Sequence, residues 1–392
     1  MAILVLNAGS SSLKFALFDD DAGKASSSGE VDWKGQGKPA SLTLREGDGP
    51  GREQDCDASD PASAARLAIE AVGDPSAIKA VGHRVVHGGL KFRESIRIDD
   101  SIEADLDHLA ELAPLHNPPA IAGIDAAKRA LPGVPQFAAF DTSFFANLPR
   151  SVATYAIPHA WTDDWGIRKF GFHGISHSYC LGRAGEILGR DPKALRLIVC
   201  HLGNGCSASA IRGGVAIDTT MGYTPVDGLM MGTRSGTVDP GVLTHVIGHR
   251  GLSADQVDRA LNHESGLLGV SGVSGDYRKV EEAAGSGDER AKLALEIYAG
   301  RVRSTIGAFA ATLGGLDALV FAAGVGEHSA TLRAAACEGL DFLGVRLDPT
   351  KNQAQPKDAD IAPAGSPARV LVIHTEEELM IAREVSRLSA VH

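Results

Sequence analysis

Most of what the sequence says about architecture starts from one stretch, Ile3-Leu4-Val5-Leu6-Asn7-Ala8-Gly9-Ser10-Ser11-Ser12-Leu13-Lys14-Phe15-Ala16-Leu17-Phe18. Ile3–Leu6 is apolar throughout and predicts a buried strand, and Leu13–Phe18 predicts a second one. The polar residues between them favour a tight turn. Glycine lets a ligand approach the backbone, and successive N–H groups with Ser and Asn side chains can bind an anion. The turn therefore either holds a phosphate or simply joins two strands.

The same pattern recurs near the middle of the chain. Leu197–Cys200 predicts a buried strand and Ala208–Ile211 a returning one, joined by His201-Leu202-Gly203-Asn204-Gly205-Cys206-Ser207. Gly213-Gly214 then turns the chain into Val215–Ile217. Two related Gly/Ser-rich hairpins, one in each half, indicate an internal duplication and favour a pair of phosphate-binding turns.

Strand and helix patterns alternate in both halves of the chain. A third apolar strand, Ala318–Ala322, ends in Gly324-Val325-Gly326-Glu327-His328, and a helical pattern follows from Ser329. Ala25–Pro61 lacks periodicity and predicts exposed hairpins or loop. Helical periodicity marks Ser63–Val72, Ser101–Leu112, Ala120–Ala130, Ser253–Asn262, Glu289–Leu313 and Thr375–Leu388. This alternation predicts an α/β fold of two lobes with a cleft between them.

Composition excludes several classes of protein. The 392 residues include 38 Lys+Arg against 49 Asp+Glu, a net charge of −11, and 44% are hydrophobic. This length suits about two domains, and an acidic chain without a basic block argues against binding to nucleic acid or to an anionic membrane. Five cysteines without CxxC spacing favour neither a disulfide framework nor a zinc ribbon. The N-terminal residues make a poor signal peptide, and no run of about 20 apolar residues could span a membrane. A cytosolic enzyme or binding protein is therefore expected.

Charged side chains recur in glycine-rich turns. Arg84 stands in Gly82-His83-Arg84-Val85-Val86-His87-Gly88-Gly89, and Arg234 in Gly232-Thr233-Arg234-Ser235-Gly236. Asp141 follows the apolar Gln136–Phe140, and His173 and His177 lie among glycines. Taken singly, each has a simpler explanation. Arg84 could form a structural salt bridge, Asp141 could cap a helix, and Arg234 could lie in a surface loop. The two histidines could bind a metal ion, although they lack the HExxH motif.

Together these groups fit phosphoryl transfer. Its transition state spreads negative charge over the phosphoryl oxygens, so that catalysis consists mainly of positioning and of surrounding cations and donors. Two arginines and a histidine could surround the transferred group, with a carboxylate and Mg²⁺ managing the remaining charge. The chain has no GxxxxGK[ST] loop, which excludes a P-loop as the phosphate holder.

The same residues resemble a known family. Val5–Lys14 and Gly171-Phe172-His173-Gly174-Ile175-Ser176-His177 are similar to the two signature motifs of the acetate kinases. The resemblance runs from end to end and is weakest at residues 20–75. Further blocks match in order: 83–89, 113–118, 140–142, 201–205, 221–225, 232–236, 324–327 and 376–383.

The resemblance implies a fold and an activity. The fold would be the duplicated lobe pair of the actin, sugar kinase and Hsp70 ATPases, which is ribonuclease H-like, with the active site in the interlobe cleft. Residues 1–145 with 380–392 would form the N-terminal lobe, and residues 146–379 the C-terminal lobe for nucleotide binding and dimerisation. The enzyme would transfer a phosphoryl group reversibly and in line between ATP and acetate, with Mg²⁺ or alternatively Mn²⁺. A cytoplasmic homodimer is implied.

The resemblance also assigns roles to single residues. Arg84 and Arg234 would bind the carboxylate and stabilise the migrating group, His173 would donate to its oxygens, and Asp141 would orient the acetate. Asn7 and Glu377 would hold the metal, with Ser10 and Ser12 nearby. Val86, Leu115, Phe172 and Pro225 would enclose the methyl group. The nucleotide side would comprise Lys14, His201, Leu202, Gly203, Asn204, Gly205, Asp276, Tyr277, Arg278, Gly324, Val325, Gly326 and His328.

Some alternatives remain open at this stage. Thr375 and Glu378 could form a capping box in which Glu377 merely begins a helix. His328 stands where the family usually has Asn. This difference would change the affinity for the nucleotide or the preference for its base, and not the reaction. His116 and His201 could be structural. A propionate or butyrate kinase is the near rival, although Val86 favours a short acid. An ATP-driven conformational module is the alternative from another class, and it would need no carboxylate-binding arginine.

Overall fold

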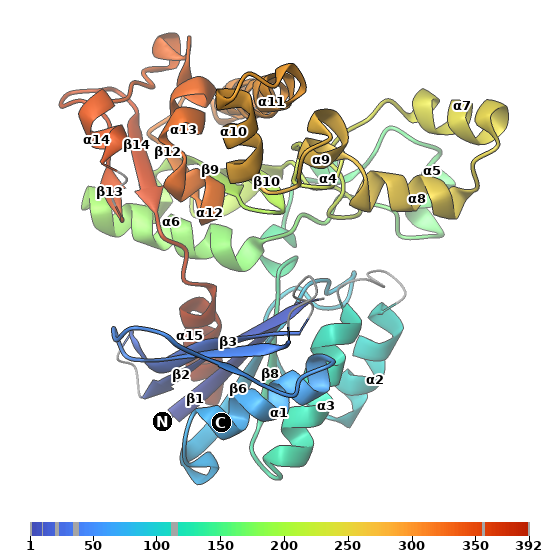
Figure 1. Cartoon of the computed structure of the whole chain (residues 1–392), viewed down its shortest axis with the longest axis vertical. Helices are drawn as coiled ribbons and strands as arrows, with labels where there is room; N and C mark the ends of the chain where they lie inside the picture. Colours follow the sequence, from blue (N-terminus) through green and yellow to red (C-terminus); the bar gives the residue numbers. More distant parts are fainter. Residues whose placement is uncertain are drawn as a thin grey trace. The chain divides into compact units, whose positions relative to one another are not determined.

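The computed structural model describes residues 2–9, 11–19, 23–33, 39–110, 117–354 and 357–390. The chain divides into two compact units, shown in Figure 1. Unit 1 comprises residues 1–146, 174–176 and 376–392, and unit 2 comprises residues 147–173 and 177–375. The lobe boundary expected at residue 380 falls inside helix α15 (Glu377–Ser389), whose first turn belongs to unit 1.

Unit 1 is built on a sheet of eight described strands in the order β5-β4-β3-β2-β1-β6-β8-β7. Strand β1 pairs antiparallel with β2 and parallel with β6, and β6 pairs parallel with β8. The two strands predicted around Asn7–Ser12 lie within β1 and β2, which confirms the first hairpin. The strands are β1 (Ala2–Ala8), β2 (Ser12–Asp19), β3 (Ala25–Asp32), β4 (Ser41–Glu46), β5 (Arg52–Asp55), β6 (Ile78–Val85), β7 (Ile96–Ile98) and β8 (Gln136–Phe140).

The segment Ala25–Pro61, expected as exposed hairpins or loop, extends this sheet through β3, β4 and β5. Val31 and Leu42 enter the core, whereas every residue of β5 is exposed. Because so few of its side chains are buried, the segment carries little of the alternation that marks a strand in sequence.

Helices cover both faces of the unit 1 sheet. Val81 of β6 packs in the core cluster that contains Ala127 and Leu131, at the end of α3 (Asn117–Ala130). Successive residues of a strand point to opposite faces. Gly82 accordingly faces α15, which packs on β1 and β6. The remaining helices of unit 1 are α1 (Pro61–Ala71) and α2 (Asp100–Leu109).

Unit 2 repeats the strand order of unit 1. Its described sheet runs β11-β10-β9-β12-β14-β13. Strands β9 and β10 are antiparallel, as are β10 and β11, whereas β12 is parallel to both β9 and β14. This matches β3-β2-β1-β6-β8 strand for strand, which confirms the duplicated α/β lobes. The strands are β9 (Arg196–Leu202), β10 (Cys206–Arg212), β11 (Val215–Thr219), β12 (Ala318–Ala322), β13 (Ala359–Asp360) and β14 (Arg369–Ile373).

The long helix α11 (Glu289–Leu313) has the bounds that its periodicity predicts. Asp288 caps its N-terminus through the N–H groups of Arg290 and Ala291, and Gly314 ends it with a φ of 68°. It packs against β9 and β10. The other helices are α4 (Arg150–Ala153), α5 (His159–Asp163), α6 (Gly174–Leu188), α7 (Pro240–Arg250), α8 (Ala254–His263), α9 (Gly266–Ser271), α10 (Tyr277–Gly285), α12 (Ala323–His328), α13 (Ala330–Cys337) and α14 (Pro349–Gln353).

Helical structure begins earlier than the expected Ser329, because Gly324–His328 belong to α12, which begins directly after β12. The fully buried Arg333 explains how so short and glycine-rich a helix is held. Its Nη1 donates to the carbonyl oxygens of Gly326 at 2.9 Å and Glu327 at 2.7 Å. These are helix-terminal carbonyls, which lack partners inside their own helix.

The close approach of β6 to α15 predicts that Gly82→Val destabilises unit 1. A Cβ at Gly82 would lie 2.7 Å from Cγ2 of Ile381 and 2.8 Å from Cγ2 of Val385. Overpacking of this kind costs about 1–3 kcal/mol, so the melting temperature and the urea midpoint should fall. Gly307→Ala in α11 is the control, because a Cβ there meets nothing within 4 Å outside its own helix. A Gly82→Val protein as stable as the parent would contradict this packing.

Candidate functional site

Three of the predicted site residues in unit 1 come from the carboxyl ends of neighbouring parallel strands. Asn7 lies near the end of β1, Arg84 lies in β6 one residue before its end, and Asp141 follows β8 directly. Since β1, β6 and β8 are parallel neighbours, their carboxyl ends meet at one edge of the sheet. Ligands of open α/β sheets bind at this edge.

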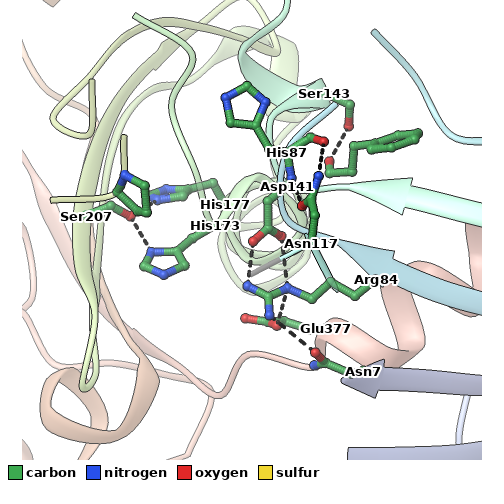
Figure 2. Close-up of polar contacts among 12 residues, drawn as sticks. Asn7, Arg84, His87, Asn117, Asp141, Ser143, His173, His177, Ser207 and Glu377 are labelled. Atoms are coloured by element: carbon green, nitrogen blue, oxygen red, sulfur yellow. Dashed lines mark hydrogen bonds and ion pairs between the residues drawn. The ribbon is translucent and has the colours of Figure 1, made fainter. Parts of the chain in front are cut away.

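Arg84 is the centre of this cluster (Figure 2). Its Nη2 and Nε donate to the two carboxylate oxygens of Asp141 at 2.5 and 3.2 Å, a bidentate pair. Its Nη1 donates to Oδ1 of Asn7 at 3.3 Å, and its Nε lies 3.8 Å from Oε2 of Glu377. Burial lowers the pKa of Arg84. The charges of Asp141 and Glu377 raise this pKa by more than burial lowers it, so that the net shift is upward. The guanidinium therefore stays charged.

Asp141 forms this pair and is not the N-cap of the turn that follows it. The turn that follows it has Thr142 as its N-cap, without a side-chain hydrogen bond. The Asp141 side chain is 1% exposed. A carboxylate this deeply buried needs a charged partner, because an isolated buried charge is costly. The salt-bridge interpretation of Arg84 is therefore correct.

The capping-box interpretation of Glu378 was wrong. Helix α15 has Glu376 as its N-cap, with no side-chain hydrogen bond at the cap. Instead, Oε1 of Glu378 accepts a hydrogen bond from Nδ2 of Asn7 at 3.0 Å. Glu377 and Glu378 thus direct carboxylates at the same cluster from adjacent positions. Sequence reasoning missed Glu378, since only the contact with Asn7 identifies it.

The first hairpin turn is closed by a hydrogen bond from the backbone N of Gly9 to the carbonyl oxygen of Ser12, 2.8 Å long. Lys14 is exposed and pairs directly with Asn7 in the β1–β2 register, so both side chains lie on one face of the sheet. Ser12 begins β2 and is half-buried. Ser10 lies outside the described residues.

The segment after β6 is tied to its surroundings by side-chain amides. The backbone N of His87 donates to Oδ1 of Asn117 at 3.0 Å, and Nδ2 of Asn117 donates back to the carbonyl oxygen of His87 at 3.0 Å. The hydroxyl of Thr142 accepts from the backbone N of Gly88. Val86, beside them, is buried. The predicted Leu115 and His116 lie outside the described residues, and Asn117 was not predicted.

In unit 2, the second hairpin brings predicted residues together. Its turn is closed by a 3.0 Å hydrogen bond from the backbone N of Gly203 to the carbonyl oxygen of Gly205. A Cβ at Gly205 would lie 3.3 Å from Nε2 of His173 and 3.7 Å from Nη1 of Arg234. The same Nη1 donates to the carbonyl oxygen of Pro225 at 3.3 Å. Thus His173 and Arg234 converge over Gly205, where a side chain would obstruct them.

His173 has an unusual backbone and a defined hydrogen-bond partner. Its φ is 59°, in the left-handed region, and it is the N-cap of α6. Its Nδ1 lies 2.9 Å from Oγ of Ser207, and Nε2 of His177 lies 2.7 Å from the same oxygen. The His173 ring stacks on His201 with centroids 4.2 Å apart. The predicted Phe172 is buried beside it in the chain. Ser207 was missed, although a buried strand that carries alternating serines is itself a signal.

A cavity of about 800 Å³ in unit 2 adjoins the second turn. Sequence analysis did not find Leu267, Gly275, Glu281 and Ser329, which also line it. The predicted Leu202 and Gly326 are buried and are not among its lining residues. Predicted nucleotide residues make up the rest of the wall: Gly203, Asn204, Asp276, Tyr277, Arg278, Gly324, Val325 and His328.

Polar groups in this cavity are fixed by local bonds. Hydrogen bonding and charge from Arg278 lower the pKa of Asp276, which also caps α10. Burial raises the pKa of Tyr277 to about 12. Nδ1 of His328 lies 2.9 Å from the carbonyl oxygen of Gly324. A carbonyl only accepts, so Nδ1 of His328 is the donor in this contact. The cavity therefore offers both donors and acceptors to a polar ligand.

No helix in the described ranges combines the length and the apolar character needed to cross a membrane.

Comparison with known proteins confirms the resemblance. Residues 2–383 match the model of the acetokinase family. An acetate kinase from Gloeobacter violaceus is 51% identical and aligns over 98% of both chains. Among solved structures, Porphyromonas gingivalis acetate kinase is 41% identical with a TM-score of 0.91, over 99% of each chain. A Francisella tularensis propionate kinase is 38% identical with a TM-score of 0.91, over 98% of this chain and 99% of its own. With a family match over nearly its whole length, the chain belongs to the acetokinase family.

Proposed function

We propose that the chain is an acetate kinase, which transfers a phosphoryl group reversibly and in line between ATP and acetate. The observation that carries the proposal is the convergence of His173 and Arg234 over Gly205, next to a cavity lined by Gly203 and Asn204. A nucleotide in that cavity would direct its phosphates at the turn. The transferred group would then lie beside two donors, which is what phosphoryl transfer requires.

On the nucleotide side, we assign binding to the cavity and to the second turn. Backbone N–H groups in a glycine-rich turn can surround phosphate oxygens. Arg234 would supply a permanent charge and His173 a donor where negative charge develops in the transition state. The Asp276–Arg278 pair and His328 would contact the nucleoside, since they line the same cavity.

On the acceptor side, we assign acetate binding to Arg84. Asp141 and Asn7 occupy three of its five N–H groups and leave one on each Nη for an anion, among the described residues. Asp141 holds the fork in one orientation and would orient the acetate through it. Val86, Phe172 and Pro225 are proposed to enclose the methyl group, together with Leu115.

We propose Mg²⁺ as the metal, with Mn²⁺ as the alternative. The amide oxygen of Asn7 and the carboxylates of Glu377 and Glu378 are hard oxygen donors, and Mg²⁺ typically takes one or two carboxylates together with water and phosphate oxygens. The donor set of this cluster therefore fits the ion. When bound, Mg²⁺ neutralises charge on the phosphate oxygens. Glu377 and Asn7 would hold it, and Arg84 would keep both oriented.

We further propose that the enzyme is a cytoplasmic homodimer and that unit 2, the nucleotide-binding unit, carries the interface. Helix α7 has no buried residue, yet Val242 and Ile247 expose 49% and 43% of their surface. Apolar side chains on a helix without a core face favour contact with a partner. The cytoplasmic location is proposed from the likeness to the acetate kinases.

The direct test is acyl-phosphate trapping. Purified protein with Mg-ATP, acetate and hydroxylamine should form acetyl hydroxamate, because the reagent captures acetyl phosphate as it is released. Protein without ATP is the blank. If neither acetate nor C3 and C4 acids give product while the protein remains folded by circular dichroism, the proposed activity is wrong.

Arg84→Ala and Arg234→Ala should each lower kcat by about 10²–10³-fold, the usual cost of removing one donor to developing charge. Arg129→Ala on α3 is the matched control, since its side chain is 77% exposed. Steady-state rates in the hydroxamate assay measure the effect. Variants at Arg84 and Arg234 with near-parental kcat would show that the assigned roles are incorrect.

Val86→Ala should shift preference toward propionate. One methylene in an apolar pocket is worth about 1–3 kcal/mol, so the propionate-to-acetate ratio of kcat/KM should rise roughly tenfold. Val31→Ala is the control: it removes a fully buried valine from the core of unit 1 and should lower stability without changing the ratio. An unchanged ratio for Val86→Ala would exclude this residue from the acid pocket.

A further inference from the structure

Four polar side chains of unit 2 form a continuous chain of hydrogen bonds that ends at His173. Oγ of Ser209 lies 2.8 Å from Nδ1 of His177, whose Nε2 lies 2.7 Å from Oγ of Ser207. That oxygen lies 2.9 Å from Nδ1 of His173 (Figure 2). Ser207, Ser209 and His177 are all 0% exposed. Ser207 and Ser209 are two apart on β10 and therefore share a face, and His173 is the N-cap of α6, the helix that carries His177.

The number of available hydrogens allows the donors in this chain of hydrogen bonds to point in only two directions. Ser207 has one hydroxyl hydrogen and lies between two ring nitrogens, so it donates to one and accepts from the other. In the first direction every donor points toward His173, whose Nδ1 then accepts. In the second direction every donor points toward Ser209, and His173 carries a proton on Nδ1. The choice fixes what the opposite nitrogen of His173 can offer when the ring is neutral.

Ser209 selects the first direction. In the part of the chain that the structure describes, the partner of its hydroxyl is Nδ1 of His177. If His177 donated to Ser209, the buried hydroxyl hydrogen would be left without an acceptor, at a cost of about 1–3 kcal/mol. Burial, with the nearby His201, holds the pKa of His177 well below its usual range, so that its ring is neutral with a single N–H. That proton must then sit on Nε2 and point at Ser207.

We propose that Ser209, His177 and Ser207 are positioning residues that hold His173 as a neutral imidazole with its proton on Nε2. Ser207 donates to Nδ1 of His173, so that the single ring proton lies on Nε2. This is the nitrogen that lies 3.3 Å from the Cβ position of Gly205, with Nη1 of Arg234 at 3.7 Å from that position. Two donors therefore face one place, and no ring lone pair competes there for a proton.

This arrangement suits an anion with several acceptor oxygens. A neutral donor stabilises charge that develops on a phosphoryl oxygen without binding the resting anion as strongly as a cation would. The inference rests on the proposed role of His173 in phosphoryl transfer for its catalytic meaning. The tautomer itself is argued from the hydrogen bonds that join the four side chains.

The tautomer can be read directly by long-range ¹H–¹⁵N correlation on full-length protein labelled with ¹⁵N-histidine, without substrates. His173→Gln and His177→Gln assign the two rings. At neutral pH we expect unprotonated Nδ1 and protonated Nε2 in both His173 and His177. Protonated Nδ1 of His173, whether as the other tautomer or as imidazolium, would overturn the inference.

Variants test whether the chain acts through His173. Ser207→Ala should lower kcat roughly tenfold or more while KM for acetate and for ATP changes little, because a donor is misdirected but not removed. Ser209→Ala should move the His173 Nδ1 signal toward the protonated range, although two side chains separate them. Thr219→Val is the control: Thr219 pairs with Ser209 across β10 and β11, and its buried hydroxyl bonds the carbonyl oxygen of Ala208 outside the chain.

Thr219→Val should lower stability without altering kcat or the His173 spectrum. If it changed the spectrum as Ser209→Ala does, or if Ser209→Ala left the spectrum unchanged, a relay through these residues would be refuted. An inactive parent protein that shows the expected tautomer would overturn the proposed function and support this inference. An active enzyme in which Nδ1 of His173 is protonated would support the proposed function and overturn this inference.

Discussion

The ion pair between the half-buried Arg84 and the buried Asp141 is the interaction on which the proposed acceptor site depends. Removing two charges from water costs several kcal/mol per ion, and apolar residues of similar volume are often as stable or more so. A bidentate contact with Nη2 to Oδ2 at 2.5 Å recovers part of this cost. The contribution of this ion pair to the stability of the fold is therefore too small to explain why charged residues occupy these positions. Its value is a permanent positive charge in a single orientation, which the oxygens of Asn7 and Glu377 also face.

The duplication explains why two units with the same strand order carry different chemistry. In unit 1 the carboxyl ends of β1, β6 and β8 present Asn7, Arg84 and Asp141, a set suited to holding a carboxylate and a metal. In unit 2 the equivalent ends of β9 and β12 lead into a glycine turn and into α12, which line a cavity. The same backbone plan thus provides one edge rich in charge and one edge rich in backbone N–H groups.

Sequence reasoning succeeded where a property is local and failed where it depends on contacts between elements. The hairpin at Asn7, the second hairpin that repeats it and the bounds of α11 follow from periodicity. The contact of Glu378 with Asn7, the serines that join His177 to His173 and the clamp of Arg333 on α12 do not. Each of these depends on which side chains meet across elements distant in sequence, which no window of residues contains.

An acidic chain that handles anions must keep its few functional cations from binding too tightly. A free guanidinium would hold acetate, phosphate and product alike, which lowers KM without raising kcat. Asp141 neutralises part of the charge of Arg84 and occupies its preferred fork, so a resting anion gains little there. Charge that spreads over the transferred group still meets the remaining N–H groups. In unit 2, a neutral His173 beside Arg234 also favours the transition state over the resting anion. It offers an oriented hydrogen-bond donor without adding a second positive charge.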